Sequence, residues 1–162
     1  MAPAGALEPV LLILGSLPGE ASLKAQRYYA HPQNQFWRLL GGALGEPLAE
    51  LDSDRRLARL AARGVGLWDV IGEARRIGSL DGAIRNVTAN ALADYVALQP
   101  QLGAIAFNGL TAARIGRRAL GPTTLALIDL PSSSPAYTLA FPDKAARWSA
   151  LANFAQPATV RP

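Results

Sequence analysis

One stretch of the sequence constrains the fold more than any other. It is a five-residue apolar run, residues 10–14, that ends in the turn Gly15-Ser16-Leu17-Pro18-Gly19. A short apolar run bounded by turn residues is typical of a strand buried on both faces of a sheet. Glycines at the carboxyl end of a strand let the backbone approach a ligand closely. The segment 31–37 (His-Pro-Gln-Asn-Gln-Phe-Trp) follows with amide, imidazole and aromatic groups but no charged pair. Such a site suits a flat, polar, uncharged molecule such as a nucleobase.

Strand-like and helix-like segments alternate along the rest of the chain. Apolar runs predict strands over 10–14, 65–70, 104–107 and 125–130. Helical periodicity and its glycine or proline stops predict helices over 34–44, 53–63, 88–98, 110–120 and 143–154. We therefore predict an α/β fold, a single-domain three-layer α/β/α sandwich with a central four-stranded parallel sheet. The domain is expected over residues 10–154, between flexible termini 1–9 and 155–162.

Composition limits the possible functions. The 162 residues include no cysteine, which excludes a disulfide framework, a thiolate metal site and an iron–sulfur cluster. Neither a membrane-length apolar run nor a signal pattern is present, so we expect a cytoplasmic protein without membrane contact. The net charge of +4 comes mostly from arginine, the preferred phosphate contact. Arginine richness from GC-rich coding explains this charge equally well, so charge alone does not establish nucleic-acid binding.

Polar clusters follow all four predicted strands. They are the turn 15–19, Trp68-Asp69, Asn108-Gly109 and Ser132-Ser133-Ser134. The carboxyl ends of parallel strands meet at one edge of a sheet, where ligands of open α/β sheets bind. The four clusters therefore predict a single site.

Each candidate residue in these clusters also has a structural explanation. Asn34 opens a predicted helix and could simply cap it, and Asn108 before a glycine fits turn chemistry. His31 is the only histidine and shows no acidic partner in the sequence, and Tyr29 in a tyrosine pair could fill the core. The three serines could form a plain loop or contact a backbone phosphate.

Several common chemistries leave no trace in the sequence. There is no nucleophile elbow, no phosphate-loop lysine motif and no Gly-x-Gly-x-x-Gly after a strand. The two lysines, Lys24 and Lys144, would permit a Schiff-base mechanism but do not require one.

The joint pattern resembles the uracil-DNA glycosylase superfamily. The turn 15–19 with segment 31–37 is similar to the family's first motif, closest to the mismatch-specific and thymine-DNA glycosylase branch and to the hypoxanthine-DNA glycosylase branch. Residues 130–136 (Leu-Pro-Ser-Ser-Ser-Pro-Ala) resemble the second motif, the loop that enters DNA as a base flips out. The similarity extends through 64–69, 107–109 and 141–144, and thus covers about residues 10–154.

One departure within the resemblance separates the branches. The mismatch-specific branch carries a catalytic asparagine in its first turn, where this chain has Leu17. The hypoxanthine branch resembles this chain in using the asparagine of the His-Pro-x-Asn segment, here Asn34. The second motif has Leu130 where other branches have histidine or asparagine. The resemblance thus implies excision of deoxyinosine in preference to deoxyuridine.

The resemblance also implies a role for each site residue. A monofunctional glycosylase would need no metal or cofactor, would act on damaged DNA containing inosine and possibly uracil, and is expected to be a monomer. Asn34 would orient the attacking water. The base would be bound by Gly15, Ser16, Leu17, Tyr29 and Asn108, with Tyr29 stacking on it, and the DNA intercalation loop would be Pro131, Ser132, Ser133, Ser134, Pro135 and Ala136. Two alternatives remain open: a uracil- or mismatch-specific glycosylase of the same superfamily, and a non-catalytic nucleotide- or nucleic-acid-binding module.

Overall fold

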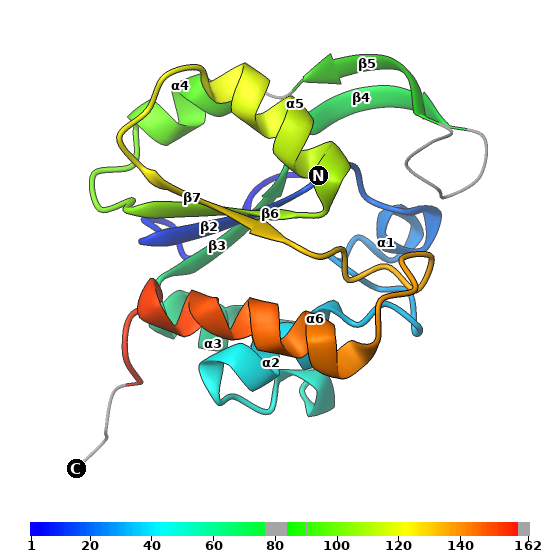
Figure 1. Cartoon of the computed structure of the whole chain (residues 1–162), viewed down its shortest axis with the longest axis vertical. Coiled ribbons are helices and arrows are strands. Elements are labelled where there is room, and N and C mark those ends of the chain that lie inside the picture. The colour runs from blue at the N-terminus through cyan, green and yellow to red at the C-terminus, as the bar shows by residue number, and fades with distance from the viewer. Residues whose placement is uncertain (77–83, 90, 159–162) are drawn as a thin grey trace.

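The protein is a three-layer sandwich in which helices cover both faces of a central sheet (Figure 1). The computed structural model describes residues 1–76, 84–89 and 91–158. The strands of the sheet lie in the order β1-β3-β2-β6-β7. Their bounds are β1 Ala4–Gly5, β2 Leu11–Gly15, β3 Val65–Asp69, β6 Ala104–Asn108 and β7 Ala126–Leu130. The predicted α/β/α sandwich is confirmed.

The sheet has five strands, so the prediction of four was wrong. β2, β3, β6 and β7 pair in parallel, as the alternation of elements predicted. The fifth strand, β1, is antiparallel, with Ala4 opposite Leu67 and Gly5 opposite Gly66. It comes from residues 1–9, for which we predicted a flexible terminus. A two-residue strand has no periodicity of its own, and only the exposed edge of β3 gives it a partner.

The central strands are buried because both faces of the sheet are covered. All residues of β2 and β6 are buried. Leu11 and Ile13 pack into one apolar cluster with Phe36 and Trp148, whereas the alternate residue Leu12 packs into the other with Phe107. The period-two alternation of a strand divides one apolar run between two cores.

The helices form the outer layers. α4 (Leu92–Ala97) and α5 (Leu110–Leu120) lie on one face, and α2 (Phe36–Leu44), α3 (Ser53–Ala62) and α6 (Phe141–Trp148) lie on the other (Figure 1). The short helix α1 (Glu20–Ala25) follows β2 at the carboxyl end of the strands. Among the described residues there are also two 3-10 turns, η1 (Leu48–Glu50) and η3 (Ser149–Asn153). No helix within the described residues is long and apolar enough to cross a membrane.

A two-stranded antiparallel hairpin replaces the start of one predicted helix. The hairpin consists of β4 (Ile71–Arg76) and β5 (Ile84–Ala89). The predicted helix over 88–98 therefore begins only at Leu92. Thr88 and Ala89 belong to β5 and pair with β4. This cross-strand pairing, and not the helical spacing of apolar residues further along the chain, decides their conformation.

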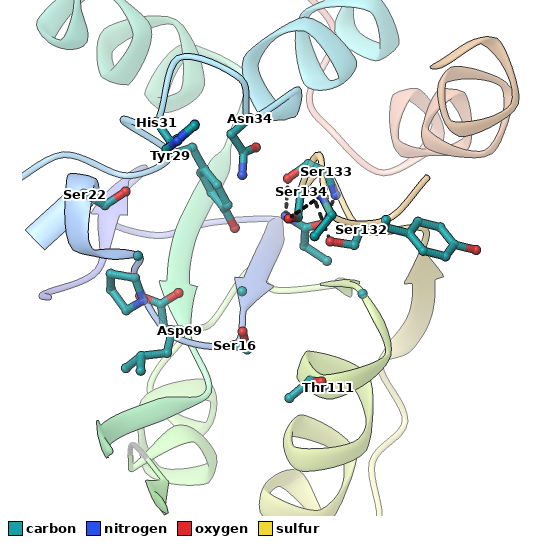
Figure 2. A pocket seen from close by; sticks show the side chains of 18 of the residues that line it. Ser16, Ser22, Tyr29, His31, Asn34, Asp69, Thr111, Ser132, Ser133 and Ser134 are labelled. Atoms are coloured by element: carbon teal, nitrogen blue, oxygen red, sulfur yellow. Dashed lines mark hydrogen bonds between the residues drawn. The ribbon is translucent and has the colours of Figure 1, made fainter. Parts of the chain in front are cut away.

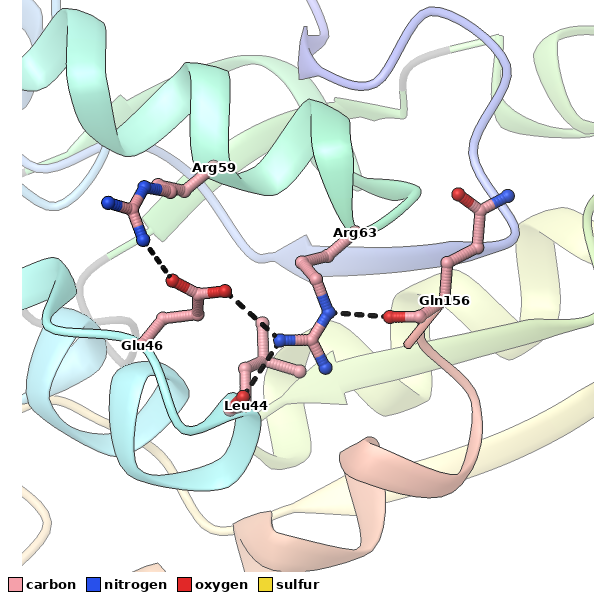
Figure 3. Close-up of polar contacts among 5 residues, drawn as sticks. All are labelled: Leu44, Glu46, Arg59, Arg63 and Gln156. Atoms are coloured by element: carbon pink, nitrogen blue, oxygen red, sulfur yellow. Dashed lines mark hydrogen bonds and ion pairs between the residues drawn. The ribbon is translucent and has the colours of Figure 1, made fainter. Parts of the chain in front are cut away.

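A buried guanidinium fastens the amino-terminal side of the sheet. Arg63, at the end of α3, is 8% exposed. Its Nε donates to the carbonyl of Gln156 at 2.5 Å, and its Nη1 donates to the carbonyl of Leu44 at 2.8 Å and contacts Glu46 Oε1 at 3.2 Å (Figure 3). Gln156 N–H in turn donates to the carbonyl of Arg63 at 2.8 Å. Arg63 thus anchors residue 156, within a segment that we predicted to be flexible.

Candidate functional site

A cavity of about 600 Å³ opens at the carboxyl ends of the parallel strands. Segments that follow β2, β6 and β7 contribute to its wall together with Asp69, the last residue of β3, and all four polar clusters of the sequence are represented. The residues that line it are 15–22, Tyr28, Tyr29, His31, Asn34, Asp69, 108–111, 129–137 and Arg147.

The turn after β2 passes so close to other polar groups that only glycine fits at its start. A Cβ atom on Gly15 would lie 2.8 Å from Asp69 Oδ1 and 2.8 Å from the hydroxyl oxygen of Tyr29. The amides of Val70 and Ile71 donate to the carbonyls of Gly15 and Ser16 at 2.9 and 3.0 Å, which fixes the turn against the end of β3. Gly15, Ser16 and Leu17 all line the cavity, where we predicted base-binding residues.

Tyr29 projects across the cavity from a left-handed backbone conformation, with φ of 53°. Its ring stacks on Phe36 with centroids 3.7 Å apart and planes 7° apart. One face of Tyr29 is therefore covered by Phe36 of the core, and the residue lines the cavity. The neighbouring Tyr28 is core: its hydroxyl donates to the carbonyl of Ala2 at 2.8 Å, and burial, with Asp69 as a further cause, raises its pKa.

Asn34 points into the cavity from the segment before α2 (Figure 2). Its side-chain Oδ1 accepts the backbone amide of Phe36 at 3.0 Å, and its backbone amide donates to the carbonyl of His31 at 3.0 Å. The helix begins at Phe36, two residues later than predicted. Gln35 is the N-cap residue of α2, so Asn34 precedes the cap, but its side-chain carbonyl still satisfies the first amide of the helix. This bond fixes the orientation of the side chain in the cavity wall. The structural and the functional explanations of Asn34 are compatible.

Asn108 holds the loop after β7. Its Nδ2 donates to Ser133 Oγ at 2.9 Å, and its Oδ1 accepts the amide of Ser133 at 2.9 Å. Ser133 is 1% exposed, so this bidentate contact is shielded from water. Both polar atoms of Asn108 thus bond to Ser133, and one hydrogen on Nδ2 and one lone pair on Oδ1 are not used in these two bonds. Its predicted role in reading a base stays a prediction.

The loop 131–136 is held rigidly at its base and exposed at its tip. The carbonyl of Pro131 accepts from Trp148 Nε1 at 2.9 Å, and the carbonyl of Ser133 accepts the amide of Gln35 at 3.0 Å. Ser132 and Ser134 accept backbone amides of the same loop through their hydroxyl oxygens at 3.1 and 3.2 Å. Their hydroxyl hydrogens can still be donated outward, for example to a phosphate. Pro135 and Ala136 are exposed at the mouth of the cavity.

Asp69 is the residue to which the sequence analysis gave no role. It ends β3 directly opposite Gly15 in the sheet register, is 4% exposed, and lines the cavity. Of the carboxylates that line the cavity it is the buried one, since Glu20 is exposed and Asp129 pairs with Arg117 at 2.9 Å. Trp68-Asp69 stood among the four polar clusters, but only the pairing of β3 with β2 places this carboxylate beside Tyr29 and Gly15.

Metal-binding groups are not assembled in the described part of the chain, where no three His, Cys, Asp or Glu side chains cluster. His31 is exposed, and its Nδ1 accepts the amide of Gln33 at 3.1 Å. Neither lysine lines the cavity as described. The cavity wall therefore includes the ring of Tyr29, the side-chain amides of Asn34 and Asn108, and the buried carboxylate of Asp69.

This combination of fold and site matches one family. The model of the uracil DNA glycosylase superfamily matches residues 2–155, and the chain belongs to that superfamily. Its members include DNA glycosylases, enzymes that hydrolyse the N-glycosidic bond between a base and its sugar.

Two curated relatives are both named hypoxanthine DNA glycosylase. The protein from Methanosarcina acetivorans is 37% identical over 143 residues, which cover 87% of this chain and 89% of the relative. The protein from Methanosarcina barkeri is 41% identical over 99 residues, 61% of this chain and 63% of the relative. A solution NMR structure from Methanosarcina acetivorans, of a protein proposed to be a uracil DNA glycosylase, superposes with a TM-score of 0.81 at 34% identity and covers 93% of each chain.

Proposed function

We propose that this protein is a monofunctional DNA glycosylase that removes deaminated bases, hypoxanthine before uracil, in base excision repair. The observation that carries the proposal is a cavity with a stacking face and a buried acceptor, Tyr29 and Asp69, in a chain related to hypoxanthine DNA glycosylases. We further expect it to work in the cytoplasm as a monomer.

Base recognition follows from the hydrogen-bonding pattern of hypoxanthine. The base presents a donor at N1 and an acceptor at O6, whereas adenine presents an acceptor at N1 and a donor at its 6-amino group. We assign the N1 donor to the carboxylate of Asp69, and O6 to backbone amides of the turn 15–19. With adenine the carboxylate would face a lone pair, and a buried polar mismatch costs about 1–3 kcal/mol. Normal base pairs also resist flipping more than mispairs do.

Catalysis would rest on position and electrostatics. The bond between the sugar's anomeric carbon and the base nitrogen breaks, and its electron pair leaves with the base. Water adds to the resulting oxocarbenium-like centre and loses a proton, and the departing base gains one, so that the products are the free base and an abasic sugar. Asn34 would orient that water through the side-chain amide that faces the cavity. An amide is a weak base, but a cationic transition state needs only a positioned nucleophile. Because both lysines lie outside the cavity as described, water and not an amine is the nucleophile of this proposal.

The rim of the cavity supplies the contacts to duplex DNA. Ser132 and Ser134 can donate to phosphate oxygens. The tip of the loop 131–136 carries only small apolar side chains, but Leu110 at the start of α5 is 85% exposed and Tyr137 is 47% exposed. Gly109 brings α5 against the loop, since a Cβ there would lie 3.2 Å from Ser132 Cβ. We assign Leu110, with the loop tip, to the gap that a flipped nucleotide leaves.

The decisive experiment is single-turnover excision on duplexes that differ in one base, followed by alkaline cleavage at abasic sites. Hypoxanthine should be released faster than uracil, and adenine should not be released. A duplex with 1-methylhypoxanthine, in which a methyl group replaces the N1 hydrogen, should resist excision if Asp69 reads that hydrogen. A clear preference for uracil would assign the protein to a uracil-directed branch, and release of no base would leave a binding module.

A further inference from the structure

Lys144 is a buried cation that the chemistry proposed above does not use. It lies on α6 and is 1% exposed. Buried lysines are rare unless they are paired with an acid. Within the described residues, no carboxylate forms an ion pair with Lys144. An uncompensated charge in this position calls for an explanation.

The partners of Lys144 are neutral groups from two separate segments of the site. Its Nζ donates to Gln35 Oε1 at 2.9 Å and to the carbonyl of Ser134 at 3.1 Å. The same nitrogen lies 5.4 Å from the ring centroid of Tyr137. Gln35 directly follows Asn34, whereas Ser134 belongs to the loop 131–136. One ammonium group therefore bridges the segment that carries the candidate catalytic amide and the loop expected to contact DNA.

A second bond joins the same two segments. The amide of Gln35 donates to the carbonyl of Ser133 at 3.0 Å. Gln35 therefore contacts the loop directly through its backbone and indirectly through Lys144. Hydrogen bonds from a charged donor are about twice as strong as those between neutral groups. Burial of the side chain lowers the pKa of Lys144 below its ordinary value.

We propose that Lys144 is a positioning residue that holds Asn34 and the loop 131–136 in the relative position that excision requires. This inference rests on the proposed glycosylase function. Lys144 does not line the cavity, so it acts through Gln35 and Ser134 and not on the substrate. Its long side chain extends from α6 and contacts both segments. The bridge between the two segments therefore depends on a residue that belongs to neither of them.

The test replaces Lys144 with methionine, which keeps the length and apolar stem of the side chain but removes the charge and its donors. Single-turnover excision should fall about 10- to 100-fold, because displacement of a reacting group by about 1 Å can cost 10²-fold. Affinity for undamaged duplex should change less than about threefold, because the buried ammonium group of Lys144 makes no direct contact with a phosphate in this proposal. Amide hydrogen exchange in residues 131–136 of the free protein should become faster. Lys144→Arg retains a charged donor and should fall between Lys144→Met and the wild type.

The matched control is Lys24→Met. Lys24 is exposed on α1, and its substitution removes the same formal charge. It should leave both excision and loop exchange at wild-type values. An equal loss in the Lys24 and Lys144 variants would overturn the proposal in favour of a general charge effect.

A second variant keeps the test independent of how well Lys144→Met folds. Gln35→Met removes the acceptor and retains the lysine, and should reproduce the loss of excision and the faster loop exchange. The double variant should lose no more than the stronger single variant, since both act through one contact. Wild-type excision and loop exchange in either single variant, or additive losses, would overturn the proposal. If the wild type excised no deaminated base the proposed function would fail, while loop exchange in the free protein would still test the bridge.

Discussion

A buried cation lies at each end of the central sheet, and the two cations differ in their partners. At the amino-terminal side, Arg63 contacts the carboxylate of Glu46 and two backbone carbonyls (Figure 3). At the carboxyl-terminal side, Lys144 has only neutral partners among the described residues and lies beneath the loop 131–136. A compensated charge stabilises a fixed junction. At the carboxyl-terminal side, the proposed role of the buried charge is instead to position two segments of the site.

The comparison extends to the surrounding groups. Around Arg63, the hydrogen bonds close a packed junction between α2, α3 and the residue Gln156, and Arg63 does not line the cavity at the carboxyl ends of the strands. Around Asn34 and Asp69, polar groups face an open volume of about 600 Å³. Stability and function should therefore be separable by mutation at the two ends.

The largest effect is expected at the amino-terminal side. Arg63→Met leaves the Leu44 and Gln156 carbonyls without their donor and removes one partner of Glu46, and the loss of one member of a buried pair costs about 3–5 kcal/mol. Thermal and urea unfolding should show that loss, while excision per folded molecule stays at the wild-type rate. A selective loss of excision at unchanged stability would erase the distinction between the two ends.

Asn34→Ala should show the opposite pattern. Loss of a preorganised polar group at a transition state costs about 10²–10³ in rate. Its bond to the amide of Phe36 accounts for only about 1 kcal/mol of stability, as for a helix cap. Single-turnover rates and a melting curve on the same sample separate the two. A variant that melts lower but excises normally would reduce Asn34 to a cap.

Leu110→Ala tests the rim of the cavity, and Leu98→Ala is its matched control. Both leucines are highly exposed, at 85% and 78%, but only Leu110 lines the cavity mouth. Excision from duplex should fall about tenfold for Leu110→Ala, which corresponds to about 1.4 kcal/mol, and should not change for Leu98→Ala. Neither variant should unfold earlier. Equal rates for the two variants would place the gap-filling group elsewhere.

The smallest effect is expected from a helix cap that does not line the cavity. Asp52 Oδ1 accepts the amide of Arg55 at 2.9 Å and caps α3. Asp52→Ala should lower the free energy of unfolding by about 1 kcal/mol and leave excision unchanged. Asp52→Asn should retain most of that stability. A change in excision here would show that this helix cap also supports the site.

Local patterns in the sequence were sufficient to predict much of the site. The apolar run before Gly15, the parallel strands and the convergence of four polar clusters follow from periodicity and from the geometry of parallel sheets. The resemblance to the glycosylase superfamily is confirmed by the family match, and Asn34, Tyr29 and the loop 131–136 do line one cavity. These features depend on residues that are close in sequence or on the shared direction of parallel strands.

The remaining features were decided by contacts between distant residues. Strand β1 exists because β3 offers it an edge, and the hairpin β4–β5 takes residues that helical spacing assigned to a helix. The side chain of Asn108 contacts Ser133, 25 positions away, and Lys144 contacts Gln35, 109 positions away. A sequence pattern reports the periodicity of one segment, whereas a hydrogen bond between segments depends on where the packed core places both. Composition, periodicity and motif spacing therefore determined the fold class and the location of the site, and tertiary packing alone decided the partners of its polar groups.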